Sequence, residues 1–283
     1  MLNALTPGLA ALIIAASTGA ASATVNATLT PNTTTSASTT PVVLHVTGLA
    51  TGSAVVVQRY ADANGNGNGT VDTDEFRAES FSVTDGQVTS IAGVRNTNIP
   101  GDEDGSANGE ISIHMTPATG PELGRLAGTQ LIRIKSPSSA FTTFTHTLTI
   151  TQLEQSQSIS GTVKNGTTPV PYAAVALIDA ADDGEFALGV TANATGQFTA
   201  NAPAGSYQLF AVKSGYVAGF SGPVDLAAEA AATHNLTLSP ATTTISGTVA
   251  DASTSTGLAG IQFFLQSEGG MVTVTSTGDS GTY

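Results

Sequence analysis

The sequence lacks cysteine and tryptophan entirely, and only eight of its 283 residues are lysine or arginine. Without cysteine the chain has no disulfide, no thiolate that could bind zinc and no thiol nucleophile. With so few basic residues and a formal net charge of −13, it also lacks the positive clusters that bind nucleic acid or anionic membrane surfaces. We therefore expect neither nucleic acid nor a membrane surface as a partner.

Long apolar runs are also missing, apart from a short one at the N-terminus. The run from Leu9 to Ala16 is followed by Ala21, Ser22 and Ala23, a small-residue cleavage pattern, although residues 1–8 carry no basic residue. The run is too short to span a bilayer, which disfavours a membrane anchor. We predict a signal peptide at residues 1–23 and a secreted or cell-surface protein with no membrane span after signal removal. Export without disulfides favours a bacterial source.

Residues typical of strands and turns dominate the rest of the chain, and 40% of all residues are hydrophobic, which suffices for buried cores. Between residues 42 and 150, short alternating apolar segments are separated by turns that contain Gly and Asn. In the clearest segment, Phe144, His146, Leu148 and Ile150 share one face and threonines share the other. The pattern predicts an antiparallel immunoglobulin-like β-sandwich over residues 24–157. The segments are 42–46, 54–60, 79–83, 110–115, 130–135 and 141–150.

A repeated motif marks the second half of the chain. The pentapeptide ISGTV begins at Ile159 and again at Ile245, and the first copy continues with PVPYAAVAL, ATGQF, PAGSYQL and SGY. In this order the motifs resemble the carboxypeptidase regulatory-like domain. The resemblance implies a transthyretin-like sandwich at residues 158–240 that contains no catalytic residue. The whole chain is thus predicted to be all-β, with tandem antiparallel sandwiches.

The second copy, residues 241–283, is predicted to be partial, because it has no counterpart of PAGSYQLFAVKSGY. Half a sandwich leaves an open edge, so we expect the natural protein to continue beyond Tyr283. In the first copy, Gly196 and Gly205 are predicted to take the positive φ of tight turns. The strand at 206–213 carries apolar residues at both parities, so both of its faces should be at least partly covered.

One segment has a pattern that suits a metal ion: Asp62 to Glu75, DANGNGNGTVDTDE. It resembles the calcium loops of EF-hands and dockerins, in which short oxygen-bearing side chains converge on the ion and a glycine makes a sharp turn. Its flanks are strand-like, so the loop would join strands and not helices. Asn replaces Asp at the three leading positions, which implies weak Ca²⁺ binding, with a Kd of about 0.1–1 mM. The implied ligands are Asn64, Asn66, Asn68, the Thr70 carbonyl, Asp72 and Glu75.

Two alternatives to this assignment stay open. A register that starts at Asp62 places Thr73 at the twelfth position, where a carboxylate is wanted, and is disfavoured. The loop could also be an ion-free Asn-Gly turn. A second acidic loop, residues 101–110, offers Asp102, Asp104 and Asn108. Acidic Gly-rich turns are common, so here a turn without metal is the preferred interpretation.

The sequence shows no catalytic motif and only a weak case for glycan binding. The histidines, at positions 45, 114, 146 and 234, all lie in strand-like segments, and GxSxG, HExxH and CxxC are absent. Sugar-binding platforms usually need exposed aromatic rings, and Tyr60 is the only Tyr or Trp in the first predicted domain. We predict no catalytic residue and no cofactor other than Ca²⁺.

These observations together predict a non-catalytic, exported, modular β-protein that serves as a cell-surface or extracellular spacer or adhesion scaffold. Its partners would be other extracellular modules or surface proteins, with glycans as a weaker option. The alternative is that these domains are accessory modules of a larger secreted hydrolase or peptidase whose catalytic domain lies beyond this sequence. Further repeats downstream favour the scaffold, and a catalytic domain downstream favours the alternative.

Overall fold

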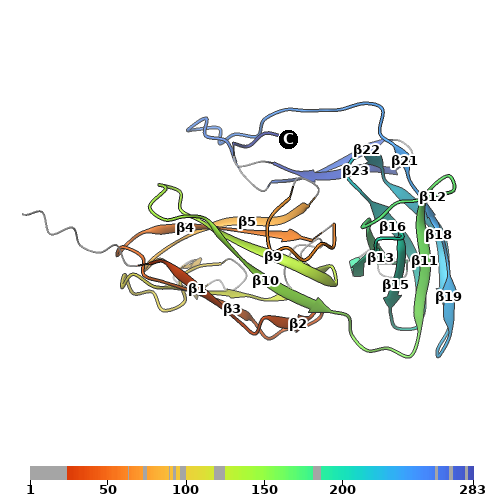
Figure 1. Cartoon of the computed structure of the whole chain (residues 1–283), viewed down its shortest axis with the longest axis horizontal. Helices are drawn as coiled ribbons and strands as arrows, with labels where there is room; N and C mark the ends of the chain where they lie inside the picture. Colours follow the sequence, from red (N-terminus) through yellow and green to blue (C-terminus); the bar gives the residue numbers. More distant parts are fainter. Residues whose placement is uncertain are drawn as a thin grey trace, which may run out of the picture.

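The computed structural model confirms that the chain is all-β (Figure 1). Among the residues it describes, no helix is both long and apolar enough to cross a membrane. The predicted signal peptide, residues 1–23, lies outside the described residues. The structure describes residues 24–62, 64–72, 75–88, 90–91, 94–95, 100–117, 125–180, 186–258, 261–267, 270–277 and 280–283.

The first unit, residues 24–151, consists of two main sheets. One sheet is antiparallel and has the order β1-β3-β8. The other has the order β2-β10-β9-β4-β5 and is antiparallel except for the parallel pairing of β2 with β10. A short hairpin, β6-β7, lies between β5 and β8 in the sequence. The strands are β1 (Asn26–Thr30), β2 (Thr33–Thr35), β3 (Val42–Thr47), β4 (Ala54–Ala61), β5 (Phe76–Thr84), β6 (Ser90–Ile91), β7 (Val94–Arg95), β8 (Ile111–Met115), β9 (Gly128–Lys135) and β10 (Phe144–Thr151).

The core of the first unit forms where the two main sheets contribute alternate residues. In β3, Val42, Leu44 and Val46 are fully buried and the residues between them are half-buried. In β10, Leu148 and Ile150 are buried, whereas the threonines between and after them are at least partly exposed. Burial in these two strands therefore alternates with a period of two residues, as the pattern of the sequence predicted.

The second unit, residues 158–240, also has two main sheets. In one, β11 lies between antiparallel neighbours β12 and β15 and also pairs in parallel with β19 and β20. The other sheet is antiparallel with the order β14-β13-β16-β18, and β17 pairs with β21. The strands are β11 (Ser158–Asn165), β12 (Thr168–Pro169), β13 (Ala174–Asp179), β14 (Phe186–Thr191), β15 (Gln197–Asn201), β16 (Gly205–Val212), β17 (Tyr216–Val217), β18 (Gly219–Leu226), β19 (Ala231–Thr233), β20 (Leu236–Thr237) and β21 (Ser239–Pro240).

The two glycines expected to take positive φ behave differently. Gly196 has a φ of +70°, and a Cβ there would lie 2.8 Å from the Val163 carbonyl oxygen, so the turn requires glycine. The prediction for Gly205 was wrong, because its φ is not in the left-handed region. Gly205 is already paired with Leu226 as the first residue of β16, so its backbone follows the strand.

A hydrophobic cluster joins the two units, and we call it the junction cluster. The face of β13 and β16 that points away from the second unit's own core packs against the end of β4 and the segment before β9. Ala127 of the first unit donates its N–H to the Gly189 carbonyl at 2.8 Å and also packs into the core of the second unit. Both faces of β16 are therefore covered, as its sequence predicted. The buried members of the cluster are Ala61, Leu126, Ala174, Ala176, Phe210 and Val212.

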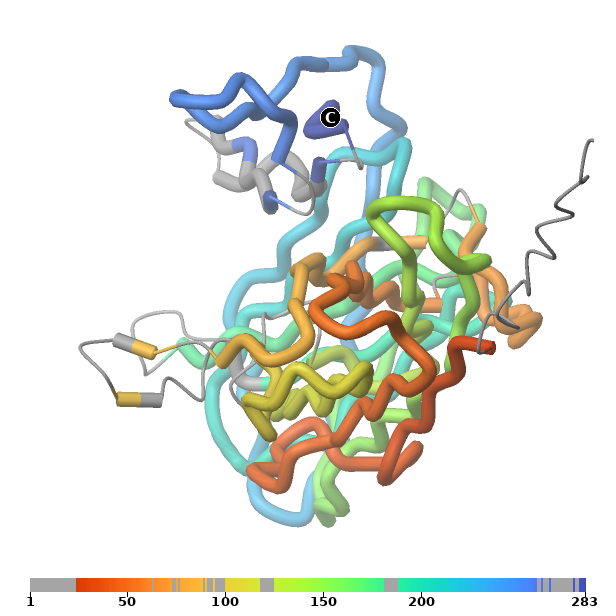
Figure 2. Tube along the Cα trace, turned by 90° about the vertical axis from the view of Figure 1, so that its left-hand side faces the viewer, coloured from red at the N-terminus to blue at the C-terminus, as the bar shows by residue number. Residues whose placement is uncertain are grey.

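The third region, residues 244–283, lies to one side of the two units in both views (Figures 1 and 2). It contains the hairpin β22 (Gln262–Ser267) and β23 (Gly270–Ser276). The side chain of Arg77, on β5, donates a hydrogen bond to the Thr277 carbonyl. Ile159 opens the first ISGTV motif and is 0% exposed, whereas Ile245 opens the second and is 58% exposed. Ile159 packs in the core of the second unit, whereas Ile245 belongs to no hydrophobic core cluster among the described residues.

Candidate functional site

The predicted calcium loop connects β4 to β5, which pair with each other in an antiparallel hairpin. We call the described residues 64–72 and 75 the Asn-Gly loop. Its three asparagines form consecutive turns, in which the backbone N–H two residues ahead donates to the side-chain oxygen. These bonds run from Asn66 N to Asn64 Oδ1 at 3.0 Å, from Asn68 N to Asn66 Oδ1 at 2.9 Å and from Thr70 N to Asn68 Oδ1 at 2.7 Å. Asn favours such turns because its short side chain can bond to the nearby backbone.

The same three side chains converge on one carboxylate oxygen. The Nδ2 groups of Asn64, Asn66 and Asn68 donate to Oδ2 of Asp72 at 2.9, 2.8 and 3.1 Å. These bonds, led by that from Asn66, lower the pKa of Asp72 below its usual value. Four of the six predicted ligands are therefore gathered around one point.

Glu75 lies next to this cluster and has an unusual environment. Its Oε2 accepts the backbone N–H of Asp72 at 3.0 Å, whereas its Oε1 is buried and accepts no hydrogen bond from the residues that the structure describes. Burial, aided by the charges of Asp62 and Asp72, raises the pKa of Glu75 to about 7. A nearby cation would relieve this repulsion and favour the ionised carboxylate.

Thr70 and Asp62 also form hydrogen bonds with residues of the Asn-Gly loop. The Thr70 hydroxyl donates to Asn68 Oδ1 at 2.7 Å, which places this predicted ligand at the end of the row of turns. Asp62 is 6% exposed and accepts the backbone N–H groups of Gly65 at 2.8 Å and Gly67 at 3.3 Å. Within the described part of the chain, no three His, Asp or Glu side chains are grouped so that they could hold a metal ion. Any cation here would thus depend on amide and backbone oxygens in addition to the carboxylates.

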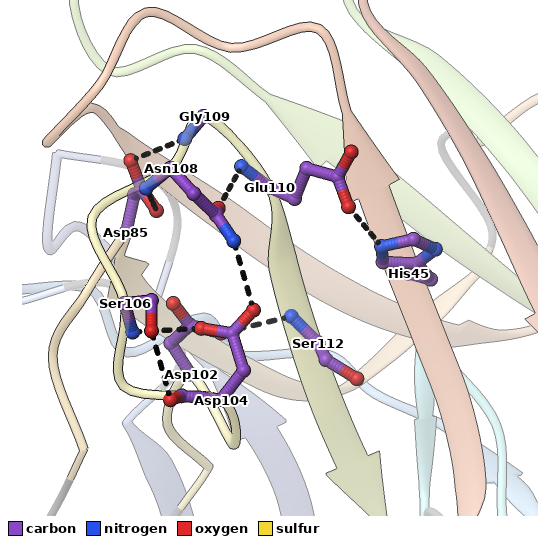
Figure 3. A network of polar contacts seen from close by, with 9 residues as sticks. All are labelled: His45, Asp85, Asp102, Asp104, Ser106, Asn108, Gly109, Glu110 and Ser112. Atoms are coloured by element: carbon purple, nitrogen blue, oxygen red, sulfur yellow. Dashed lines mark hydrogen bonds and ion pairs between the residues drawn. The ribbon is translucent and has the colours of Figure 1, made fainter.

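The second acidic loop is organised differently (Figure 3). Asp102 is 0% exposed, and its two oxygens accept the backbone N–H groups of Gly86 at 2.8 Å and Ser112 at 3.0 Å. Asp104 accepts the backbone N–H of Ser106 at 2.7 Å and the side-chain amide of Asn108 at 3.1 Å. These contacts make both carboxylates parts of turns.

Asp85, which sequence reasoning did not single out, anchors this second loop. It is 3% exposed and accepts backbone N–H groups from Gly52 at 2.7 Å, Gly109 at 2.9 Å and Asn108 at 3.1 Å. Burial opposes ionisation of Asp85, but the three N–H groups together outweigh it, so the pKa lies below its usual value. In the sequence it is only an Asp before a Gly, which is typical of any turn.

The contacts of two histidines fit structural roles. His45 Nε2 lies 3.1 Å from Glu110 Oε2, and both side chains are exposed. The ring of His146 packs edge-on against Phe144, and burial lowers its pKa.

Comparison with known families gives a match in the second unit. Residues 158–239 match the model of the family described as the carboxypeptidase regulatory-like domain. This confirms the predicted resemblance for that part of the chain. No curated protein matches the sequence.

Several solved structures share a loose overall similarity with the chain. A streptococcal ancillary pilin is 12% identical, with 83% of this chain and 79% of that one covered and a TM-score of 0.26. The Bacillus anthracis TIE protein is 12% identical, with 92% and 66% covered and a TM-score of 0.27. A double mutant of the shaft pilin SpaA from Lactobacillus rhamnosus GG is 12% identical, with 68% and 87% covered and a TM-score of 0.25. At these TM-scores the similarities carry no argument about this protein.

Proposed function

We propose that the protein is a non-catalytic, exported scaffold that holds other extracellular modules or surface proteins in place. The observation that carries this proposal is the junction cluster, in which Leu126 is 2% exposed and Phe210 is 7% exposed between the two units. An apolar interface of this kind disfavours free motion between domains, because separating the units would expose these side chains to water. A regulatory-like domain in the second unit agrees with a role without catalysis.

Calorimetry of the full chain tests the rigidity that this function needs. We expect the first and second units to unfold together in one cooperative transition in the wild type, because the junction cluster couples them. Leu126→Asp places a charge in the cluster and should split this transition into two. Leu153→Asp is the matched control, since Leu153 is already 42% exposed. Two transitions in the wild-type protein would contradict the proposal.

Within this scaffold, the Asn-Gly loop is a weak Ca²⁺ site in our proposal. The gathering of Asn64, Asn66 and Asn68 around Asp72 supports it, because it brings three side-chain amides and a carboxylate to one point, and their oxygens are the kind of ligand that Ca²⁺ takes. The buried Oε1 of Glu75 supports it further, since this atom has no donor among the described residues. Extracellular calcium at millimolar concentration would suit a site of this strength.

Thermal unfolding of the full chain tests the calcium site. For a Kd of about 1 mM, about 10 mM Ca²⁺ should stabilise the protein by about 1.4 kcal/mol. Asp72→Ala and Glu75→Ala should remove this gain, whereas Asp104→Ala, in the second acidic loop, should keep it. The same concentration of Mg²⁺ serves as the ionic control. An absent gain, or an equal gain in all the variants, would overturn the calcium proposal.

A further inference from the structure

The Asn-Gly loop continues directly from the junction between the two units. Ala61, the last residue of β4, is 3% exposed and packs within the junction cluster. The next residue, Asp62, donates its N–H to the Thr129 carbonyl at 3.0 Å, and its carboxylate holds the N–H groups of Gly65 and Gly67. The base of the loop is therefore fixed both to the first unit and to the interface.

The loop itself touches the second unit at Tyr172. A Cβ built on Gly65 would lie 2.6 Å from Cε1 of the Tyr172 ring, so the ring fits against the bare backbone of this glycine. Tyr172 lies between β12 and β13 and has a φ of +54°, and its N–H donates to the Asn193 carbonyl at 3.3 Å. Lys213 Nζ, also in the second unit, lies 6.0 Å from the centroid of the same ring. Tyr172 is thus held by its own unit while its ring rests on the loop of the other.

We propose that the Asn-Gly loop and Tyr172 form a clamp that sets the orientation of the second unit relative to the first. The position of Gly65 depends on the turns of Asn64 and Asn66, and these turns depend on the amides gathered by Asp72. An ion that draws the amide oxygens inward would move the backbone against which the ring rests. Ca²⁺ binding and the orientation of the units are then coupled in both directions. This last step rests on the proposed calcium site, whereas the clamp does not.

Gly65 and Gly67 provide a matched pair of test positions. Their φ angles are +62° and +61°, so alanine suffers the same backbone strain at either position. A Cβ on Gly67 meets no described atom within 4 Å, whereas one on Gly65 meets Tyr172. Gly65→Ala and Gly67→Ala therefore differ chiefly in the contact that defines the clamp.

The absence of cysteine allows the orientation to be measured in the full chain with two spin labels. Ser138→Cys and Ala228→Cys place the labels at exposed positions, one in each unit. We expect Gly65→Ala to shift and broaden the distance distribution, and Gly67→Ala to leave it as in the wild type. In a Tyr172→Ala background the two glycine variants should behave alike. Equal distributions for Gly65→Ala and Gly67→Ala in the presence of Tyr172 would overturn the clamp.

A calcium titration of the same labelled proteins separates the two proposals. We expect Ca²⁺ to change the distance distribution of the wild type, and Tyr172→Ala to abolish that change while keeping the heat of Ca²⁺ binding. Heat of binding without any change in the wild-type distribution would overturn the coupling but not the calcium site. No heat of binding would overturn the calcium site, and the comparison of the two glycines would still decide the clamp.

Discussion

The two Gly-rich loops of the first unit resemble each other in sequence, but their carboxylates have different partners. Asp85 and Asp102, around the second acidic loop, are 3% and 0% exposed, and the hydrogen bonds described above come from backbone N–H groups. Asp72, in the Asn-Gly loop, is half-buried and accepts its bonds from side-chain amides.

The kind of donor decides what each carboxylate can do. A backbone N–H is fixed by the fold, so a carboxylate that accepts it holds that part of the fold together. A side-chain amide can turn away from a carboxylate by rotation of its own side chain. Asp72 can therefore exchange its hydrogen bonds for a cation without losing a backbone bond, whereas Asp85 and Asp102 would have to give up backbone bonds to do so.

Of the substitutions that test this comparison, Asp85→Ala is expected to lower the stability of the protein most. Asp85→Ala leaves three backbone N–H groups without their acceptor, of which that of Gly109 is buried, and an unsatisfied buried group costs about 1–3 kcal/mol. Together with the loss of the two more exposed bonds, we expect the free energy of unfolding to fall by about 2–3 kcal/mol, measured by urea unfolding near neutral pH. Asp104→Ala is the control, because Asp104 is exposed and should cost less than about 1 kcal/mol. Equal losses in the two variants would break the comparison.

The next effect concerns Asp102. Asp102→Ala removes the acceptor for the N–H groups of Gly86 and Ser112, which join the turn after β5 to β8. With two bonds instead of three, we expect a loss of about 2 kcal/mol in the same urea experiment. The loss should be the same with and without Ca²⁺. A calcium-dependent loss would mean that this loop, too, binds the ion.

Much of the fold was predictable because its strands are short apolar segments separated by turns. The segments proposed at 42–46, 54–60 and 130–135 are β3, β4 and β9 with nearly the same bounds. What covers the outer face of β16 was not predictable. Its apolar residues at both parities indicated a covered face, but Ala61 and Leu126, which cover it, are distant in the sequence.

The candidate site, too, was predictable only where its contacts are local in the sequence. The resemblance to calcium loops predicted that the asparagines and Asp72 converge on one point, and their side chains do meet. The contact with Tyr172 depends on how the two units pack, and no local pattern encodes it. The role of Asp85 depends on the approach of Gly52 and Gly109, which flank other strands.

A third test uses pH. The pKa of Asp85 lies below its usual value of 3.8 in the folded protein. A carboxyl with a lowered folded-state pKa contributes stability that is fully present above the unfolded pKa and is lost as the pH falls through the folded pKa. We therefore expect the wild type to lose stability as the pH falls below about 3.8, and Asp85→Asn to lose less over the same range. Parallel curves for the two proteins would show that Asp85 does not couple folding to pH.

The smallest expected change in stability, and the sharpest contrast between the loops, comes from adding a charge to each. Asn66→Asp replaces an amide that donates to Asp72 at 2.8 Å, and Asn108→Asp replaces one that donates to Asp104 at 3.1 Å. Both substitutions put like charges together, so both should slightly lower stability without metal.

With Ca²⁺ the two variants should diverge. An additional carboxylate at Asn66 strengthens a calcium loop, and a gain of roughly 1.4 kcal/mol would appear as an about tenfold lower Kd. Asn108→Asp should gain nothing, because Asp85 and Asp102 remain bound to backbone N–H groups and Asp104 keeps that of Ser106. Calorimetric titration measures both affinities. If calcium tightened equally on the two variants, added charge alone would explain the binding, and the kind of hydrogen-bond donor would not be what separates the loops.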